Sequence, residues 1–289
     1  MRFENCPACG SVSLRPAGSR LPSDLQRCGA CGLVFFVTRP TETALIEHYQ
    51  NYPVTGSVPQ ITVKRYEELL RSFEPFRSTG KMLDVGCGEG FFLASAQKAG
   101  WEVYGTEFAD IYLPICISKG IRMQQGRLNP ANYSPGSFDV ILWIEVIEHI
   151  DYPVQELENI RQLLRPGGVL YLTTPNFNAV SRRLLGGRWT VIDYPGHLTY
   201  YTPSSLKRLL EKSGFESVSV RTDGISIGRL KDALGKKKGT NEDFHAVDKD
   251  WQATLERNRM NRTIKRLANS ILAVTGSGDS LKGLFRKKP

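Results

Sequence analysis

Residues 83–90, with the sequence LDVGCGEG, constrain the fold of this chain more than any other stretch. An apolar run leads into Asp84, and a glycine-rich turn then opens the helix-like run 91–96. Gly86 and Gly88 let the backbone turn tightly and approach a ligand, and free amides at a helix start favour a carboxylate or phosphate. The spacing is Gly-x-Gly-x-Gly, whereas the dinucleotide fingerprint is Gly-x-Gly-x-x-Gly. The sequence therefore predicts a cofactor cradle whose ligand is not NAD.

The same motif resembles the first motif of the class I S-adenosylmethionine-dependent methyltransferases, and the resemblance extends from about residue 60 to the C-terminus. It implies that Asp84 holds the aminoacyl part of the cofactor. A second strand, predicted over 101–106, ends in Glu107, 23 residues after Asp84, where a carboxylate can accept both ribose hydroxyls. The other cofactor-binding residues that the resemblance implies are Gly86, Cys87, Gly88, Gly90, Phe91, Phe108, Trp143 and Ile144.

Strands and helices alternate through the rest of this region. The near-continuous apolar run 137–144 is typical of a parallel strand buried on both faces. A helix is predicted to begin at Asp151 and Pro153 and to be stopped by residues 166–168. Its predicted inner stripe is Val154, Leu157, Ile160 and Leu164. The later predicted elements are a strand over 169–174, a helix opening at 202–205, a strand over 215–220 and a last antiparallel strand over 280–285. This order predicts an α/β fold with a doubly wound, Rossmann-like, seven-stranded sheet that binds its ligand at the carboxyl ends of the strands.

Two Cys-x-x-Cys pairs, Cys6 with Cys9 and Cys28 with Cys31, lie near the N-terminus and are separated by 18 residues. This spacing is typical of a tetrahedral four-thiolate zinc site, so we predict a zinc ribbon with structural zinc. Two disulfides are the competing interpretation. No apolar signal segment precedes the first cysteine, so we expect a reducing, cytoplasmic location. Ribbons bind nucleic acid or staple a small domain, and we favour the staple.

The predicted domain organisation has three consecutive parts. They are a zinc ribbon at 1–40, N-terminal helices that cover the cofactor site at 41–80, and a methyltransferase core at 81–289 with a basic helical insertion at about 224–279. Short helices are expected over 44–49 and 63–73. Tyr49 and Tyr52 are candidates for lining the cofactor site, with ordinary packing as the alternative.

The net charge of +9 is concentrated near the C-terminal end. Residues 229–289 carry 15 Lys and Arg against 7 Asp and Glu, which leaves the rest of the chain close to neutral. A predicted basic amphipathic helix after Trp251 is compatible with a lid over the acceptor pocket, with RNA binding, or with peripheral contact at the inner face of a membrane. We favour the lid. No apolar run approaches the ~18 residues that span a membrane.

Candidate catalytic residues follow the fourth predicted strand, in the sequence EVIEH at 145–149. Methyl transfer from a sulfonium needs in-line alignment, exclusion of water and removal of the acceptor proton, and His149 is a candidate base. The motif also resembles that of the ubiquinone-biosynthesis O-methyltransferases, which implies a divalent cation such as Mg²⁺ at Glu145, Glu148 and His149. The structural alternative is that both acids begin a helix which His149 caps or packs. His197 is a second candidate for contacting the acceptor or sharing proton transfer, again with packing as the alternative.

These features together predict a methyltransferase that acts on a small-molecule or glycan-like acceptor, at oxygen. One alternative is an RNA-modifying methyltransferase that holds its substrate with the zinc ribbon and the basic helix. Another is a catalytically silent cofactor-binding module, because Asp84, the glycine turn and Glu107 indicate cofactor binding but not turnover. The sequence leaves the acceptor and the oligomeric state open.

Overall fold

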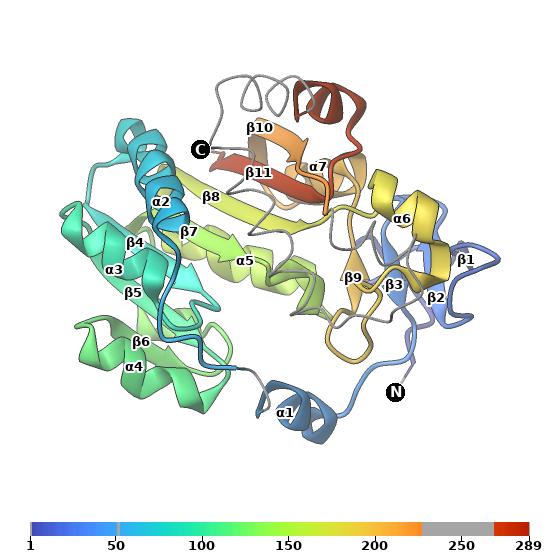
Figure 1. Ribbon diagram of the computed structural model, residues 1–289, viewed down its shortest axis with the longest axis horizontal. Helices are drawn as coiled ribbons and strands as arrows, with labels where there is room; N and C mark the ends of the chain where they lie inside the picture. Colours follow the sequence, from blue (N-terminus) through green and yellow to red (C-terminus); the bar gives the residue numbers. More distant parts are fainter. Residues whose placement is uncertain (1, 51–52, 227–268, 289) are drawn as a thin grey trace. The chain divides into compact units, whose positions relative to one another are not determined.

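The structure is a computed structural model that describes residues 2–50, 53–226 and 269–288 (Figure 1). Contacts divide the chain into two compact units. The first, which we call the cysteine unit, consists of Met1–Arg39, Thr174–Arg208 and Val220–Lys282. The second, the cradle unit, consists of Pro40–Thr173, Leu209–Ser219 and Gly283–Pro289. Most of the predicted insertion, with its amphipathic helix, lies outside the described residues, as does Tyr52.

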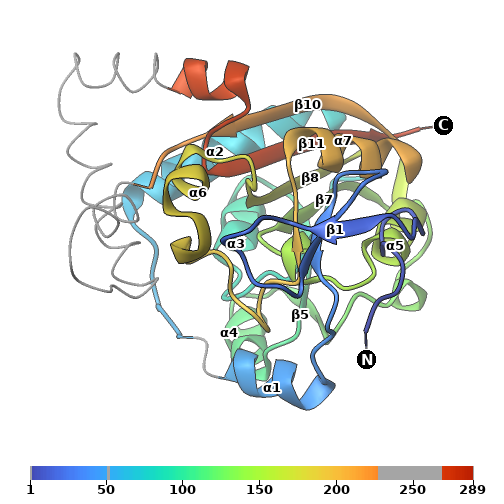
Figure 2. The ribbon, with the colours of Figure 1, turned by 90° about the vertical axis from the view of Figure 1, so that its right-hand side faces the viewer.

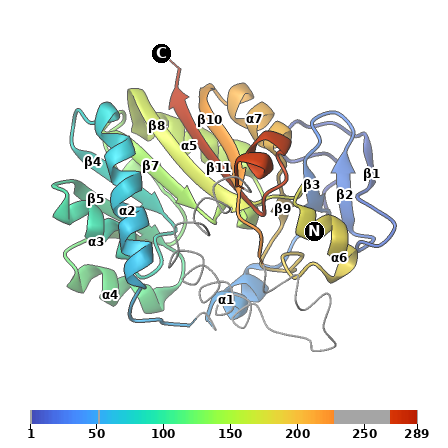
Figure 3. The ribbon, with the colours of Figure 1, turned by 45° about the horizontal axis from the view of Figure 1, so that its top comes forward.

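The larger sheet has seven strands in the order β10-β11-β8-β7-β4-β5-β6 (Figure 3). Their bounds are β4 Lys81–Val85, β5 Glu102–Glu107, β6 Arg122–Gln125, β7 Phe138–Ile144, β8 Leu164–Pro175, β10 Phe215–Asp223 and β11 Ser280–Lys287. The five strands from β6 to β8 pair in parallel, and β7 is buried over 138–143. A strand buried on both faces is expected to be mostly apolar, so the near-continuous run in the sequence did predict this central position. Its one charged residue, Asp139, is buried and forms an ion pair with Arg165.

The last strand, β11, runs opposite to β8. Lys287 Nζ, at the end of β11, donates a hydrogen bond of 2.7 Å to the carbonyl of Leu164 at the start of β8. At the other end, the amide of Asn176, just after β8, donates one of 2.8 Å to the carbonyl of Asp279, just before β11. The predicted antiparallel return strand is therefore present, and it lies between β8 and β10.

Helices cover both faces of the sheet in the cradle unit, with α2 and α3 on one side and α5 on the other (Figure 2). The bounds in this unit are α1 Glu42–Gln50, α2 Gln60–Phe73, α3 Phe91–Lys98, α4 Leu113–Ser118 and α5 Pro153–Leu163. Apolar side chains of α2 and α3, among them Phe73, Leu93 and Ala96, pack on Met82 of β4 and Val103 of β5. Among the described residues, no helix is long and apolar enough to cross a membrane.

Helix α5 ends earlier than its sequence predicts. It stops at Leu163, and Leu164 already has the extended φ of −68° and ψ of 136° that begin β8. The residue before a proline, here Arg165, disfavours helical conformation, so the helix has to end ahead of Pro166 rather than at it. Leu164 therefore belongs to the strand and not to the inner stripe. Val154, which was predicted to face inward, is 43% exposed, whereas Leu157 and Ile160 are buried as predicted.

The cysteine unit contains a second sheet, with four antiparallel strands in the order β1-β2-β3-β9. The bounds are β1 Leu14–Pro16, β2 Leu25–Cys28, β3 Val34–Phe36 and β9 Thr199–Tyr200, and helices α6 Val180–Leu185 and α7 Pro203–Lys212 flank the last strand in sequence. Every residue of β3 is buried. Phe177, Trp189 and Tyr200, from a segment more than 130 residues away, complete its apolar cluster.

Candidate cofactor site and cysteine cluster

Three glycines with positive φ shape the turn between β4 and α3, namely Gly86 at 78°, Gly88 at 53° and Gly90 at 70°. A Cβ atom on Gly86 would lie 2.6 Å from Val146 Cγ2, and one on Gly90 would lie 2.5 Å from Ile121 Cδ1. A Cβ on Gly88 would meet no described atom within 4 Å. The outer glycines are thus required by packing, whereas Gly88 faces the open space where a ligand can approach the backbone.

Asp84 lies at the carboxyl end of β4 and is only 3% exposed. Its Oδ1 atom is buried and has no hydrogen-bond partner in the part of the chain that the structure describes. Burial, with the charge of Glu107 as the second cause, raises the pKa of Asp84 to about 7. A buried carboxyl group with one free oxygen is suited to a cationic ligand group, because the cation would compensate the desolvated negative charge.

Glu107 ends β5 and lies beside the glycine turn. Its Oε2 accepts a hydrogen bond of 2.8 Å from the amide of Gly88, and its Oε1 accepts 2.7 and 2.9 Å bonds from the amides of Phe108 and Ala109. Three backbone donors therefore fix the carboxylate. The parallel pairing of β4 with β5 brings Asp84 and Glu107 to the same edge of the sheet, as the spacing of the two acids predicted.

The backbone of Cys87 forms part of the glycine turn, and its thiol packs against Cys116 and Met123. Cys87 Sγ lies 4.0 Å from Cys116 Sγ and 3.9 Å from Met123 Sδ. A Cβ on Gly105 would lie 2.8 Å from the same sulfur, so the glycine in β5 makes room for this thiol. The hydrogen bond with Cys116 and burial raise the pKa of Cys87. The side chain is thus a neutral packing group.

The remaining predicted cofactor residues surround the turn in different ways. Phe91, the first residue of α3, has its ring under Lys119, with Nζ 4.0 Å from the centroid. Phe108 contacts Tyr49 of α1, with ring centroids 5.4 Å apart. Trp143 is fully buried in β7, and Ile144 at its end is partly buried. Direct cofactor contact by these four side chains stays a prediction.

The sequence analysis did not predict the hydrogen bonds that Glu89 accepts from the segment between α1 and α2. Glu89 is 8% exposed and accepts hydrogen bonds of 2.8 and 2.6 Å from the amide and hydroxyl of Thr55, and of 2.9 Å from the amide of Gly56. Tyr112 donates a 3.0 Å bond to the carbonyl of Pro53 in the same segment. The chain between α1 and α2 is therefore tied to the glycine turn. The acid inside the motif was the available signal, but nothing in the sequence named its partner.

The acidic residues after β7 occupy an unusual stretch of backbone. Among the described residues, Glu145 is the only one other than glycine with a positive φ, which is 53°. Its Oε1 accepts a hydrogen bond of 2.7 Å from the hydroxyl of Thr173. Positive φ is strained for a side-chain-bearing residue and is often found at functional sites. Glu148 and His149 follow in the short helix η4 Ile147–His149, and their ligand atoms lie within 4.8 Å of each other. Glu148 is 1% exposed, and the ring of His149 lies 6.0 Å from that of Tyr49.

His197 belongs to the cysteine unit, in the loop before β9. Its Nδ1 lies 2.8 Å from the carbonyl of Val191, and its ring lies 6.3 Å from that of Tyr200. The side chain is half-buried. These contacts hold the imidazole in the local packing, and a role in catalysis stays a prediction.

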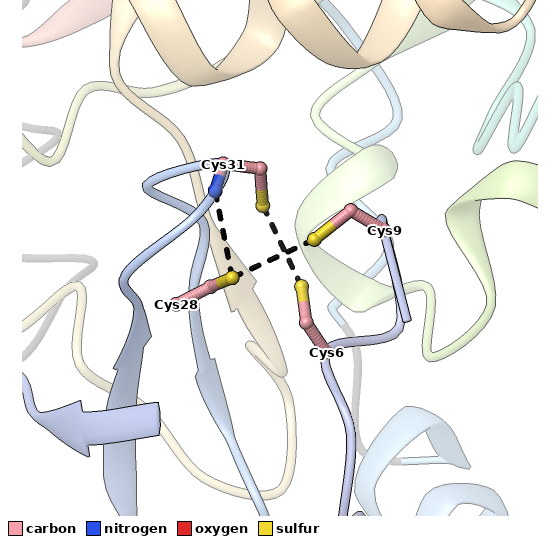
Figure 4. A group of neighbouring side chains, drawn as sticks. All are labelled: Cys6, Cys9, Cys28 and Cys31. Atoms are coloured by element: carbon pink, nitrogen blue, oxygen red, sulfur yellow. Dashed lines mark hydrogen bonds between the residues drawn. The ribbon is translucent and has the colours of Figure 1, made fainter. Parts of the chain in front are cut away.

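The four N-terminal cysteines point their sulfur atoms toward one another (Figure 4). Cys6 Sγ lies 3.5 Å from Cys31 Sγ, Cys9 Sγ lies 3.6 Å from Cys28 Sγ, and all four lie within 4.8 Å. Ligands on a tetrahedral zinc with bonds of ~2.3 Å are separated by roughly 3.8 Å. The two Cys-x-x-Cys pairs form the same kind of turn. The amide of Gly10 donates a hydrogen bond of 2.8 Å to the carbonyl of Cys6, and the amide of Gly32 donates one of 3.0 Å to the carbonyl of Cys28. The geometry and the donor set fit a four-thiolate zinc site.

Comparison with known proteins decides the family. Residues 60–220, more than half of the chain, match the family model described as a methyltransferase domain. The chain belongs to this family. The chain is 31% identical over 168 residues to the ubiquinone biosynthesis O-methyltransferase of Roseobacter denitrificans, covering 53% of this chain and 66% of that protein. The chain thus spans about two thirds of the length of that relative.

Solved structures confirm the predicted methyltransferase fold. A SAM-dependent methyltransferase from Archaeoglobus fulgidus superposes with a TM-score of 0.53 at 17% identity, covering 86% of this chain and 100% of that one. The [4+2]-cyclase SpnF superposes with a TM-score of 0.51, also at 17% identity, covering 83% of this chain and 86% of its own. At these identities the likeness concerns the fold. The cysteine cluster precedes the residues that match the family model.

Proposed function

We propose that this methyltransferase transfers a methyl group from S-adenosylmethionine to a hydroxyl oxygen of a small-molecule or glycan-like acceptor. The cradle around Gly88 is the observation that carries the proposal. The free Oδ1 of buried Asp84 matches the ammonium of the aminoacyl group, and the carboxylate of Glu107 matches the ribose hydroxyls. The bound cofactor supplies the electrophilic methyl group, and the protein contributes binding, alignment and exclusion of water.

His149 is proposed as the base that removes the acceptor proton. An imidazole ordinarily titrates near pH 6.5, so it can accept a proton at neutral pH. It follows the carboxyl end of β7 and is half-buried. Glu145 is proposed to fix the turn that carries His149, through the bond with Thr173 and its strained backbone. The alternative is a divalent cation at Glu148 and His149, whose ligand atoms are close enough to share an ion, with Glu145 as a third ligand.

An oxygen acceptor is supported by the name of the relative, which is an O-methyltransferase in ubiquinone biosynthesis. The cyclase SpnF shows that the same fold can serve other chemistry, so the fold by itself does not identify the reaction. An RNA acceptor would rest on the zinc ribbon together with the basic helix after Trp251, and that helix lies outside the described residues.

The direct test is transfer of labelled methyl groups into cell extract, followed by separation into RNA, glycan, lipid and small-molecule fractions. We expect label in the small-molecule or glycan fraction, lost with Asp84→Ala and retained with Glu67→Ala, which removes an exposed acid of α2. Label confined to RNA would reject the acceptor class. Cofactor binding by calorimetry without label in any fraction would support the catalytically silent module.

The role of His149 is tested with the identified acceptor. His149→Ala should lower kcat by ~10²–10⁴-fold with the cofactor dissociation constant nearly unchanged, and a chelator should leave the wild type active. Inhibition by the chelator, together with a raised metal requirement in Glu148→Gln, would instead support the cation. Full turnover of His149→Ala would reject both, and His197→Ala would then be the next variant to measure.

We further propose that Cys6, Cys9, Cys28 and Cys31 hold one structural zinc ion. The proposal is supported by the sulfur separations and by the matching turns of the two pairs. A closed four-thiolate site leaves no open coordination position, so a catalytic role for this ion is not expected. The ligands must be reduced, so the proposal goes with a reducing compartment such as the cytoplasm.

A further inference from the structure

The edge of the four-stranded sheet holds two arginines directly opposite each other. The antiparallel register of β1 and β2 pairs Arg15 with Arg27. Residues opposite each other have Cβ atoms roughly 5 Å apart on one face, and like charges in such pairs are destabilising. Arg15 is exposed and Arg27 is half-buried. The sheet therefore concentrates positive charge where a neutral residue would be more stable.

A third arginine, Arg182, contacts the same aromatic ring as Arg27, that of Phe177. Phe177 is 1% exposed, and its ring centroid lies 5.6 Å from Cζ of Arg27 and 4.4 Å from Cζ of Arg182 on α6. The two guanidinium carbons are thus at most 10.0 Å apart. Contact with the ring is favourable for each cation and holds the planar groups in place. We call Arg15, Arg27 and Arg182 the arginine cluster.

The arginine cluster has no counter-charge among the described residues. None of its members has a carboxylate within ion-pair distance there. Nε of Arg182 is buried and has no hydrogen-bond partner in the described chain. Burial, followed by the charges of Arg27 and Arg183, lowers the pKa of Arg182. Partly buried charges are normally paired, so within the described part of the chain this arrangement lacks an anion.

We propose that the arginine cluster binds the phosphate group of a small-molecule ligand. A phosphate monoester carries about −1.5 to −2 charges at neutral pH, which matches several guanidinium groups better than a single carboxylate does. The fork of a guanidinium also binds two phosphate oxygens at once. A bound phosphate would offset the repulsion between Arg15 and Arg27 and the repulsion that Arg27 exerts on Arg182. The site belongs to the cysteine unit, whereas Asp84, Gly88 and Glu107 belong to the cradle unit.

The test uses the full, zinc-loaded protein with inorganic phosphate as the probe, against chloride at equal ionic strength. Calorimetry should show phosphate binding that weakens at least tenfold in Arg182→Gln, the size expected for hydrogen bonds to a charged group. Arg221→Gln is the matched control, because it removes an exposed arginine of the same unit that does not contribute to the pKa shifts of Arg27 or Arg182. Wild-type protein that does not bind phosphate would overturn the proposal.

Thermal unfolding separates a ligand site from a merely structural stack on Phe177. Without phosphate, Arg182→Gln should unfold at the same temperature as the wild type or higher, because repulsion is relieved. With phosphate, the wild type should gain the larger upward shift. A lower unfolding temperature for the variant in both buffers, with equal phosphate shifts, would overturn the proposal. Arg15→Gln, at an exposed position of a short strand, provides the same comparison should Arg182→Gln not fold.

Two further probes distinguish the sources of the phosphate. Ribose 5-phosphate should compete with inorganic phosphate for the wild-type protein and fail to bind Arg182→Gln. A single-stranded RNA decamer should bind more weakly than this monoester. Tighter binding of the RNA, with affinity that falls steeply as salt rises, would assign the cluster to nucleic acid and overturn the small-molecule proposal.

Discussion

Gly86 and Gly88 both have positive φ, but a Cβ atom would contact Val146 at Gly86 and no described atom at Gly88. Gly86→Ala would bring a Cβ to 2.6 Å from Val146 Cγ2, so we expect a loss of roughly 2 kcal/mol or more in the free energy of unfolding. Gly88→Ala has open space and a φ of 53°, so it should lose only about 1 kcal/mol. Urea unfolding measures both.

Cofactor calorimetry completes the comparison of the two glycines. Gly88→Ala should weaken binding at least tenfold, because the new methyl group would occupy the space that the ligand needs. Gly86→Ala, where it folds, should bind nearly as well as the wild type. Wild-type affinity in Gly88→Ala would show that the ligand does not approach the turn at this residue.

Asp84 makes both stability and cofactor binding depend on pH. Its pKa of about 7 lies above the ordinary value near 3.9, so the folded protein keeps a proton that the unfolded chain releases between these values. Stability without cofactor should therefore fall as pH rises from about 4 to about 7, by at most about 4 kcal/mol. Asp84→Asn should remove this part of the slope in urea unfolding measured at several pH values.

The cofactor should reverse this preference for the protonated form. Its ammonium group pairs with the ionised carboxylate, so affinity should rise as pH increases toward 7, and binding near pH 6 should release a proton. Calorimetry in buffers with different ionisation enthalpies measures that proton. Affinity and heat that do not depend on pH or buffer would contradict contact between the ammonium and Asp84.

Some of these residues could be found in the sequence because a motif fixes residue type and spacing together. Asp84, the glycines and Glu107 are of this kind, and the parallel pairing of β4 with β5 then brings them together. The positive φ of Glu145 had no such signal, since it depends on how the chain leaves β7. The opposition of Arg15 and Arg27 depends on strand register, which no local pattern in this sequence specifies.

At the scale of elements, the segment between α1 and α2 is tied to the glycine turn by Glu89. Glu89→Ala removes three hydrogen bonds to Thr55 and Gly56. We expect it to lower the free energy of unfolding by about 1–3 kcal/mol and to increase protease cleavage near residue 55. Glu68→Ala, at an exposed site on α2, is the control. Unchanged cleavage would show that the segment is held by other contacts.

The parallel strands were the elements most accessible to sequence analysis. Burial on both faces makes β7, apart from Asp139, and residues 169–172 of β8 apolar runs, which few other structures require. The end of α5 was less accessible, because Pro166 acts on the residue before it and the first residues of β8 carry no strand pattern. The sequence therefore predicted these strands through their burial, whereas the end of α5 depends on a local steric effect of Pro166.

At the scale of the whole molecule, removal of zinc should affect one unit more than the other. Treatment with a chelator, or Cys9→Ser, should lower the unfolding temperature of the protein, because a structural metal contributes directly to folding. The affinity for the cofactor should stay within a few-fold of the wild type, since Asp84, Gly88 and Glu107 all lie in the cradle unit. Metal analysis should give one zinc per chain. A metal-free protein with unchanged stability would contradict the site.

The grouping of segments into units could not be read from the sequence. We predicted consecutive parts with boundaries near residues 40 and 80, and these boundaries stay predictions. The contacts join residues from both ends of the chain with its middle, as when Val34 of β3 pairs with Tyr200 of β9. Such pairing is decided by packing between distant segments, whereas sequence patterns report on neighbours along the chain.

The position of β11 has a consequence for synthesis on the ribosome. β10 is made before β11, yet in the sheet it reaches β8 only through β11. While the chain emerges, β8 therefore keeps an open hydrogen-bonding edge until residues 280–287 have been translated. A message truncated before Ser280 would yield a chain with this edge permanently unpaired, which aggregates or is degraded rather than forming a smaller active enzyme.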